Sequence, residues 1–336
     1  MPTNNNSNKP NSLFISLVSL SLLLTFITVV LSAYIRLSVN GLGCSEWPDC
    51  YGRVNMTEQH QGVDVLTAKG GAMKHSGARV AHRLIASVLG VFIVIMAMIA
   101  IRQRRQATNP GLSIPLLILA ITVFLSWLGY VTPSPLLPAV TLGNLLGGLA
   151  MLSLLWWLGQ RTVEDKTTNT RTLTKYMRPW VVFGLILLSI QIILGSWTSA
   201  WFAGPVCPEL PGCSGVQWST QGLDIFSTLN VDSQGKVINA GTAEMIHLIH
   251  RFGAMITAAY LLWLGIKIIS RKDRLFNTAL TLLTLLGLQI GVGLISVMAQ
   301  LPLLMVTTHN AIAALLLLTT INLLHLLTPQ PLHRNY

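Results

Sequence analysis

Long apolar runs, separated by shorter polar segments, dominate the sequence. Eight of these runs carry almost no charge and reach the length of about 20 residues that a helix needs to cross the hydrocarbon core of a membrane. They cover residues 13–35, 82–101, 112–131, 137–159, 180–198, 245–266, 276–298 and 303–326. The pattern predicts an all-α integral membrane protein with eight transmembrane helices.

The composition supports a membrane location. Hydrophobic residues make up 52% of the 336 positions and charged residues only 10%, whereas a soluble domain carries roughly 25% charged residues. The first run is long, only Lys9 contributes a basic charge before it, and no clear small-x-small cleavage site follows. We therefore expect a retained helix rather than a signal peptide. Because no Arg-rich transit segment precedes it, we expect a bacterial inner membrane.

The positive charge is distributed unevenly along the chain. The formal net charge is +11, and basic residues gather in the segments that follow the second, fourth and sixth runs. Alternating helices place these three segments on one side of the membrane, which the positive-inside rule assigns to the cytoplasm. Both termini are then cytoplasmic, and the two long segments 36–81 and 199–243 are periplasmic. The charge therefore indicates topology in membrane lipid, and nucleic acid is not expected as a partner.

Two halves of the chain resemble each other. The segments that begin at Cys44 and Cys207 both fit C-x-E-x-P-x-C-x-G, the second and sixth runs carry His-Arg, and V-T-x-x-N occurs in the fourth and eighth runs. The matching landmarks stand 163, 168 and 166 positions apart, a register that chance similarity would not keep. Each half has four spans, so a pseudo-twofold axis along the membrane normal should relate them. We expect two four-helix bundles, at residues 1–160 and 180–336, joined by a cytoplasmic linker at 161–179.

Two histidines of the second half are the strongest candidates for a functional site. His250 lies near the outer end of the sixth run, and His309 lies one to two turns into the eighth. Because both helices run inward, the two imidazoles should sit at similar depth. Ionisable groups inside a membrane are costly and indicate function by default. Two such histidines could ligate a haem iron axially; the alternative is a pair hydrogen-bonded to helix carbonyls.

Other polar residues accompany these histidines. Arg251, and Arg83 in the first half, directly follow a histidine and could bind a haem propionate or extend to the lipid headgroups. His247 precedes His250 by three positions on the same helix face. It could act as an alternative ligand, a hydrogen-bond partner or a proton relay. Glu244 is the carboxylate nearest to a span in this half.

The first half lacks the second histidine. His82 repeats the first one, but Gly143 and Asn144 stand where the second would recur. A porphyrin in this half would be held by His82 alone, by no histidine, or with His60 or His75 of the outer segment. Since a substrate needs an open coordination position, we expect a ligated cofactor in the second half and an open substrate pocket in the first. Decay of a former site is the alternative.

The four cysteines form two close pairs, Cys44 with Cys50 and Cys207 with Cys213. Both pairs lie in segments assigned to the oxidising side, where disulfides persist. Four cysteines permit three connectivities, and the repeat favours closure within each pair. A zinc site fits this spacing less well. Redox-active thiols are a further alternative, because an exposed disulfide in a short loop is labile.

Together these motifs resemble the heme A synthase family, the CtaA family of cytochrome oxidase assembly proteins. The resemblance rests on the G-L-G-C-x-x-W-P-x-C-Y-G loop from Gly41 to Gly52, the two His-Arg pairs, the V-T-T-H motif from Val306 to His309, and the duplication of four spans. It covers residues 13–326, nearly the whole chain.

The resemblance implies a reaction and its sites. Members of this family oxidise the C8 methyl group of haem O to the formyl group of haem A by successive hydroxylations, for terminal oxidases of the aa3 type. The resemblance implies a bound haem b at His250 and His309, with Arg251 beside it, and haem O at His82 and Arg83. It also implies haem O synthase and oxidase assembly factors as partners.

Two positions depart from the family pattern. Many members carry a second histidine where this chain has Gly143, and a glutamate three residues before the first His-Arg pair, where this chain has Arg79. The catalytic acid or base is therefore unassigned, with Glu46 and Glu58 as candidates. These departures favour a non-enzymatic haem b protein, an electron carrier or haem chaperone, as the alternative function. A membrane thiol oxidoreductase and a transporter are further alternatives.

Overall fold

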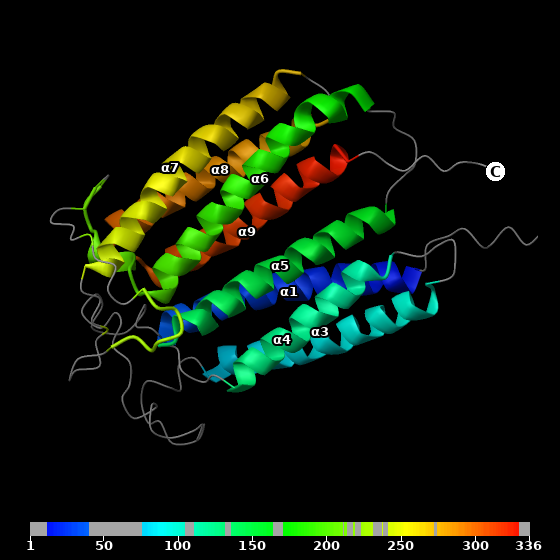
Figure 1. Cartoon of the computed structure of the whole chain (residues 1–336), viewed down its shortest axis with the longest axis horizontal. Coiled ribbons are helices and arrows are strands. Elements are labelled where there is room, and N and C mark those ends of the chain that lie inside the picture. The colour runs from blue at the N-terminus through cyan, green and yellow to red at the C-terminus, as the bar shows by residue number, and fades with distance from the viewer. Residues whose placement is uncertain are drawn as a thin grey trace, which may run out of the picture.

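Long parallel and antiparallel helices make up most of the part of the chain that the structure describes (Figure 1). The computed structural model describes residues 12–39, 76–104, 111–131, 136–163, 171–210, 212–213, 218, 223–230, 237, 241–271 and 274–328. Within these residues, eight helices are long and apolar enough to cross a membrane. They are α1 (Ser12–Val39), α3 (Ser76–Arg102), α4 (Ser113–Val131), α5 (Pro138–Val163), α6 (Arg171–Ala200), α7 (Thr242–Ile269), α8 (Phe276–Met298) and α9 (Leu303–Leu326). The predicted all-α membrane fold is confirmed.

The helices form two bundles of four. In the first, α1 packs on α3, α3 on α4, α4 on α5 and α5 on α1; in the second, α6, α7, α8 and α9 pack in the same cyclic order. Figure 1 shows the two bundles as separate layers with their helix axes nearly parallel. In this cyclic order α7 lies diagonally across from α9, as α3 lies diagonally across from α5. A residue on either diagonal pair can therefore face its counterpart through the bundle core.

The two bundles meet along α1 and α5 of the first and α6 and α9 of the second. Helix α9 is the most enclosed, with 44% of its central residues buried, whereas the peripheral α4 has only 11%. One apolar core continues across this junction, since Leu149 and Leu152 of α5 belong to the same buried cluster as Leu316 and Leu317 of α9. The halves therefore act as a single packed unit.

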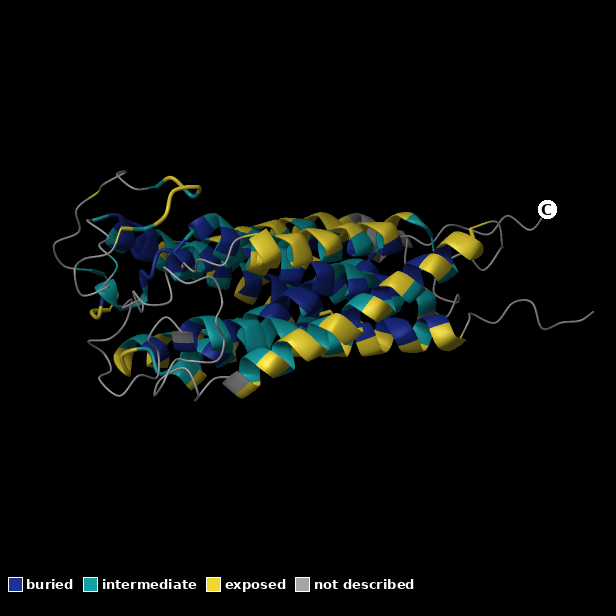
Figure 2. Ribbon diagram, turned by 90° about the horizontal axis from the view of Figure 1, so that it is seen from below, coloured by how far each residue is buried: buried dark blue, intermediate teal, exposed yellow. Residues whose placement is uncertain are grey.

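The outward faces of the helices are apolar. Figure 2 shows exposed residues along the outer side of both bundles, and many of them are large hydrophobics such as Val91, Phe183 and Leu288. An exposed apolar surface of this extent would not persist in water and is expected against lipid. The structure thus supports a multi-pass membrane protein.

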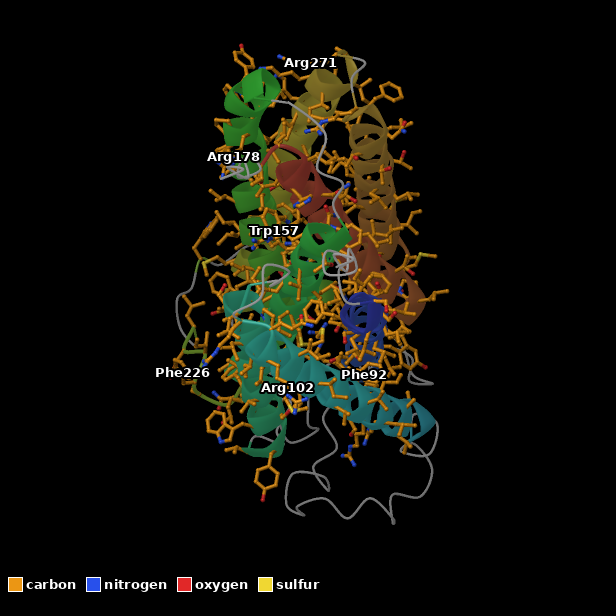
Figure 3. All side chains as sticks on the ribbon, turned by 90° about the vertical axis from the view of Figure 1, so that its right-hand side faces the viewer. Phe92, Arg102, Trp157, Arg178, Phe226 and Arg271 are labelled. Carbon is orange, nitrogen blue, oxygen red and sulfur yellow. A yellow bond between two sulfur atoms is a disulfide. The ribbon has the colours of Figure 1, made fainter. Side chains whose placement is uncertain are left out.

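The charged end of the bundle contains Arg102, Arg178 and Arg271, which lie toward the viewer in Figure 3. Near the same end, the Lys267 ammonium lies over the rings of Trp180 and Trp263, 4.8 and 4.6 Å from their centroids. Tryptophan and basic residues gather where a helix meets the membrane interface. The arrangement agrees with the uneven charge that the sequence shows.

Several helices extend beyond the apolar runs that predict them. Helix α3 begins at Ser76, before the predicted start at 82, and α7 begins at Thr242, before the predicted start at 245, so the two His-Arg pairs lie well inside their helices. Helix α6 begins at Arg171, before the predicted start at 180, and carries Pro179 within it. The extensions have a simple cause: polar residues can be helical at the interface, where water satisfies the first free N–H groups. Hydropathy reports only the part of a helix that contacts hydrocarbon.

Candidate functional site

His250 of α7 faces the core of the second bundle and is held by α6. Its Nδ1 atom lies 2.9 Å from Nε2 of Gln191, and the same amide group donates to the backbone oxygen of His250 at 3.0 Å. Gly195, one turn after Gln191, adjoins the ring: a Cβ there would come within 3.0 Å of the imidazole Cε1. One helix therefore supplies both a hydrogen bond and the space for this imidazole.

His309 of α9 is contacted by a glutamine and a glycine of α8, as His250 is by those of α6. Its Nε2 atom lies 3.0 Å from Nε2 of Gln289, and a Cβ on Gly293 would come within 3.1 Å of the imidazole Cε1. The Nδ1 atom of His309 is buried and has no hydrogen-bond partner. Since α7 and α9 are the diagonal helices of the bundle, the two histidines approach through its core, near enough to interact electrostatically.

Arg251 points away from the core, toward the outer loop. Its Nη1 donates to the carbonyl oxygens of Glu209 and Gly212 at 2.6 and 2.7 Å, and its Nη2 donates to that of Cys207 at 2.5 Å. Its Nε donates to Nε2 of His247 at 3.2 Å. Four of the five guanidinium hydrogens are thus used. In this structure, Arg251 fastens the Cys207–Cys213 loop to α7.

The loop itself is closed by the disulfide between Cys207 and Cys213, as the sequence predicts. Beyond the disulfide, the chain crosses to the first bundle: Ala139 N donates to Ile225 O and Leu229 N donates to Leu136 O, both at 2.9 Å. The outer loop of the second half therefore also contacts the start of α5 in the first.

The first bundle differs from the second at the matching positions. His82 on α3 is half-buried, Arg83 is exposed, and Asn144 on α5 is exposed. A Cβ at Gly143 would come within 2.8 Å of Leu128 Cδ2, so a leucine of α4 packs where a larger side chain would stand. The Nε atom of Arg79 is buried without a hydrogen-bond partner.

Several predicted residues lie outside the described part of the chain: Cys44, Glu46, Cys50, Glu58, His60 and His75. Their grouping, including a second disulfide, stays a prediction. In the second half, His247 is buried and Glu244 lies in the first turn of α7. The structure thus brings together His250, His309 and, through Arg251, the disulfide loop.

Sequence reasoning missed the two glutamines. Gln191 and Gln289 each precede a glycine by four positions, in Q-I-I-L-G and Q-I-G-V-G, within otherwise apolar runs. A polar residue that recurs with the same spacing in two spans of one half was the available signal, because an amide in hydrocarbon needs a partner.

The donor set of this site suits a haem iron. Among the described residues, no three or more His, Cys, Asp or Glu side chains gather as they would around a metal ion held by protein alone. Two imidazoles in an apolar bundle core suit an iron whose other ligands are porphyrin nitrogens. The buried Nδ1 atom of His309 has no hydrogen-bond partner, so the bundle alone does not satisfy this imidazole.

Comparisons with known proteins agree with the geometry. The chain is 31% identical over 316 residues to a protein named heme A synthase from Shewanella oneidensis, a match that covers 91% of this chain and 94% of that protein. The sequence profile of the COX15-CtaA family, described as cytochrome oxidase assembly protein, matches residues 16–321. With two matched bundles and a diagonal histidine pair in the second, the chain belongs to the COX15-CtaA family of cytochrome oxidase assembly proteins.

Proposed function

We propose that this protein is a heme A synthase, which oxidises the C8 methyl group of haem O to the formyl group of haem A. The observation that carries the proposal is the diagonal pair of His250 and His309 in the core of the second bundle. The similarity to a heme A synthase over nearly the whole chain supports the same activity. We further propose that His250 and His309 ligate a haem b, which would supply one-electron redox chemistry.

The two halves divide the work in this proposal. Residues 180–336 hold the haem b, residues 1–160 receive haem O at His82 and Arg83, and residues 161–179 link the halves. Support comes from the asymmetry of the bundles: the second has a histidine on each diagonal helix, whereas the first has only His82 and packs Leu128 against Gly143. His82 would then be the histidine of the first bundle that holds the substrate haem.

In this proposal the side chains of the protein bind and orient the haems, and they do not supply the oxidant. Apolar helices exclude water from the bundle cores, which keeps reactive substrate away from side reactions. The contacts of Arg251 with three loop carbonyls support a role in holding the outer loop over the second site, in place of the propionate contact that its position suggests. The acid or base for the hydroxylation stays unassigned.

We also propose the location that the charge pattern indicates. The protein would lie in a bacterial inner membrane with both termini in the cytoplasm and the cysteine loops in the periplasm. Haem O synthase and oxidase assembly factors are its proposed protein partners.

A non-enzymatic haem b protein is the alternative, and two observations favour it. Gly143 replaces the second histidine of the first half, and its surroundings are filled by Leu128. Arg79 stands where a catalytic glutamate would be expected. An electron carrier or haem chaperone would need only the second bundle.

Co-expression with a haem O synthase tests the proposal. Haem extracted from cells should include haem A only when this chain is present, and haem O alone would support the non-enzymatic alternative. The purified protein should show a low-spin b-type spectrum that His250→Ala or His309→Ala removes and His82→Ala largely retains. A colourless wild-type protein would refute the haem b site.

A further inference from the structure

Gln191 and Gln289 contact different nitrogens of their histidines. Gln191 contacts Nδ1 of His250, at 2.9 Å, whereas Gln289 contacts Nε2 of His309, at 3.0 Å. Each glutamine lies one turn before the glycine that adjoins the same ring. The two histidines therefore have the same arrangement of glutamine and glycine beside them. They differ in which imidazole nitrogen the glutamine amide contacts.

This difference matters because the two imidazole nitrogens have different roles in a ligand. A histidine that gives Nε2 to a metal carries its proton on Nδ1, and that proton is usually donated to an oxygen acceptor. The acceptor fixes the ring orientation and raises the basicity of the ligating nitrogen. A hydrogen bond at Nε2 instead occupies the lone pair or proton site that the metal would need.

The Gln191 amide can provide such an acceptor. Its Oε1 atom is buried and has no hydrogen-bond partner. It rests against Gly253 of α7, where a Cβ would come within 2.4 Å of it, so a side chain at this position would force the amide to move. In the structure the amide Nε2 faces Nδ1 and also donates to the backbone oxygen of His250 at 3.0 Å. A half-turn of the amide would break that backbone hydrogen bond and place Oε1 where Nε2 now stands, facing Nδ1 of His250. The amide can then accept the Nδ1 proton and leave Nε2 to the metal.

Gln289 contacts the Nε2 atom of its histidine, the nitrogen that the iron would need. Its amide lies at the Nε2 atom, its own Oε1 is buried without a partner, and Nδ1 of His309 is unpartnered as well. A metal that takes Nε2 of His309 must displace this amide.

We propose that Gln191 and Gln289 are positioning residues of opposite effect at the haem site. Gln191 supports His250 as a ligand through Nδ1, and Gln289 competes with the iron for Nε2 of His309. The inference rests on the proposed haem b site and adds to it two residues that no motif of the sequence assigns. It predicts that removing the two amides has different consequences for haem b.

The test uses the full-length protein, purified with haem b. The rate constant of haem loss is measured by transfer to excess apomyoglobin, and the midpoint potential of the bound haem by spectroelectrochemistry. Gln191→Leu should accelerate haem loss about 10- to 100-fold, the usual effect of removing a hydrogen-bond partner from a ligating histidine. Gln289→Leu should not accelerate it.

Gln160→Leu is the matched control. Gln160 on α5 donates to Asn322 on α9 at 2.8 Å, so this variant loses an interhelical amide hydrogen bond without contacting either histidine. Faster haem loss in Gln191→Leu than in Gln160→Leu supports the proposal, since general loosening of the bundle would affect both. Equal rates in these two variants would overturn it.

Two further measurements test the roles of Gln289 and Gln191 separately. If Gln289→Leu loses haem as fast as Gln191→Leu, His309 binds iron through Nδ1 and the competing role of Gln289 is wrong. Gln191→Glu supplies a stronger acceptor, so it should keep the haem and lower its midpoint potential. Each tenfold change in the ratio of ferric to ferrous affinity shifts a one-electron potential by about 59 mV. An unchanged potential would overturn the role of Gln191 even if Gln191→Leu fails to fold.

The failure of the proposal can be told apart from the failure of the proposed function. A wild-type protein that holds no haem b overturns both. A haem-loaded wild-type protein whose Gln191 variants match Gln160→Leu overturns only the positioning role.

Discussion

Replacing Arg251 with glutamine should release the Cys207–Cys213 loop from α7. The guanidinium donates three hydrogen bonds to the loop carbonyls of Cys207, Glu209 and Gly212. Glutamine is shorter and offers only two amide hydrogens, so it cannot reach all three carbonyls. The loop should then open more often, while the disulfide still closes it covalently.

The magnitude follows from the setting of these bonds. A hydrogen bond to a charged group contributes about 1.5–3 kcal/mol when buried. The bond to Glu209 is exposed and the other two are only partly buried, so solvent reduces each to about 1 kcal/mol. Three bonds then give about 3 kcal/mol, or roughly a hundredfold change in the loop-opening equilibrium at about 1.4 kcal/mol per factor of ten.

Disulfide reduction reports this opening. Cys207 is completely buried, so a reductant should reach the bond mainly when the loop leaves α7. The rate of reduction by dithiothreitol, followed by maleimide labelling in a background where Cys44 and Cys50 are serine, should rise roughly a hundredfold in Arg251→Gln, the estimate derived from the three bonds.

Arg83→Gln is the control, because Arg83 is the exposed counterpart of Arg251 in the first half. It should leave the reduction rate of the Cys207–Cys213 bond unchanged. If Arg251→Gln is reduced no faster than the wild-type protein, the guanidinium does not hold the loop and the reasoning fails.

Two further predictions concern close packing around glycines. A Cβ at Gly143 would stand 2.8 Å from Leu128 Cδ2, so Gly143→His should lower the free energy of unfolding by about 1–3 kcal/mol. Leu128→Ala should recover part of this loss in a double-mutant cycle; strictly additive effects would contradict the contact. Gly265→Ala should cost a similar amount, because its Cβ would meet Leu283 Cδ2 at 2.4 Å, whereas Gly291→Ala has no neighbour within 4 Å and should change stability by less than about 0.5 kcal/mol. Thermal unfolding in detergent measures both, and equal effects at the two glycines would refute the packing argument.

Much of the fold was predictable from local features. Each membrane-spanning helix must satisfy its backbone hydrogen bonds within itself, so an apolar run of sufficient length determines a helix almost regardless of its neighbours. The eight helices were predicted on this ground, and the Cys207–Cys213 disulfide was predicted from the close pairing of the cysteines and the repeat; both predictions are confirmed. Helix ends were less predictable, as α6 shows by beginning at Arg171.

The site was predictable only in part. His250 and His309 were recognisable because a histidine inside an apolar run is costly, and the structure brings them together. Their glutamine partners were not recognised, since Gln191 and Gln289 become meaningful only when α6 packs on α7 and α8 on α9. The orientation of Arg251 likewise depends on where the outer loop folds back.

The sequence by itself determined the membrane-spanning helices, their duplication and the residue types available for chemistry. These properties depend on hydropathy, length and repeat, which are read along one chain segment at a time. Only the tertiary structure decided which nitrogen of each histidine meets a glutamine, that Leu128 packs against Gly143, and that Arg251 binds the loop. Those contacts depend on how each helix is rotated about its axis and which helix lies beside it, and close packing of side chains sets both only when the whole bundle assembles.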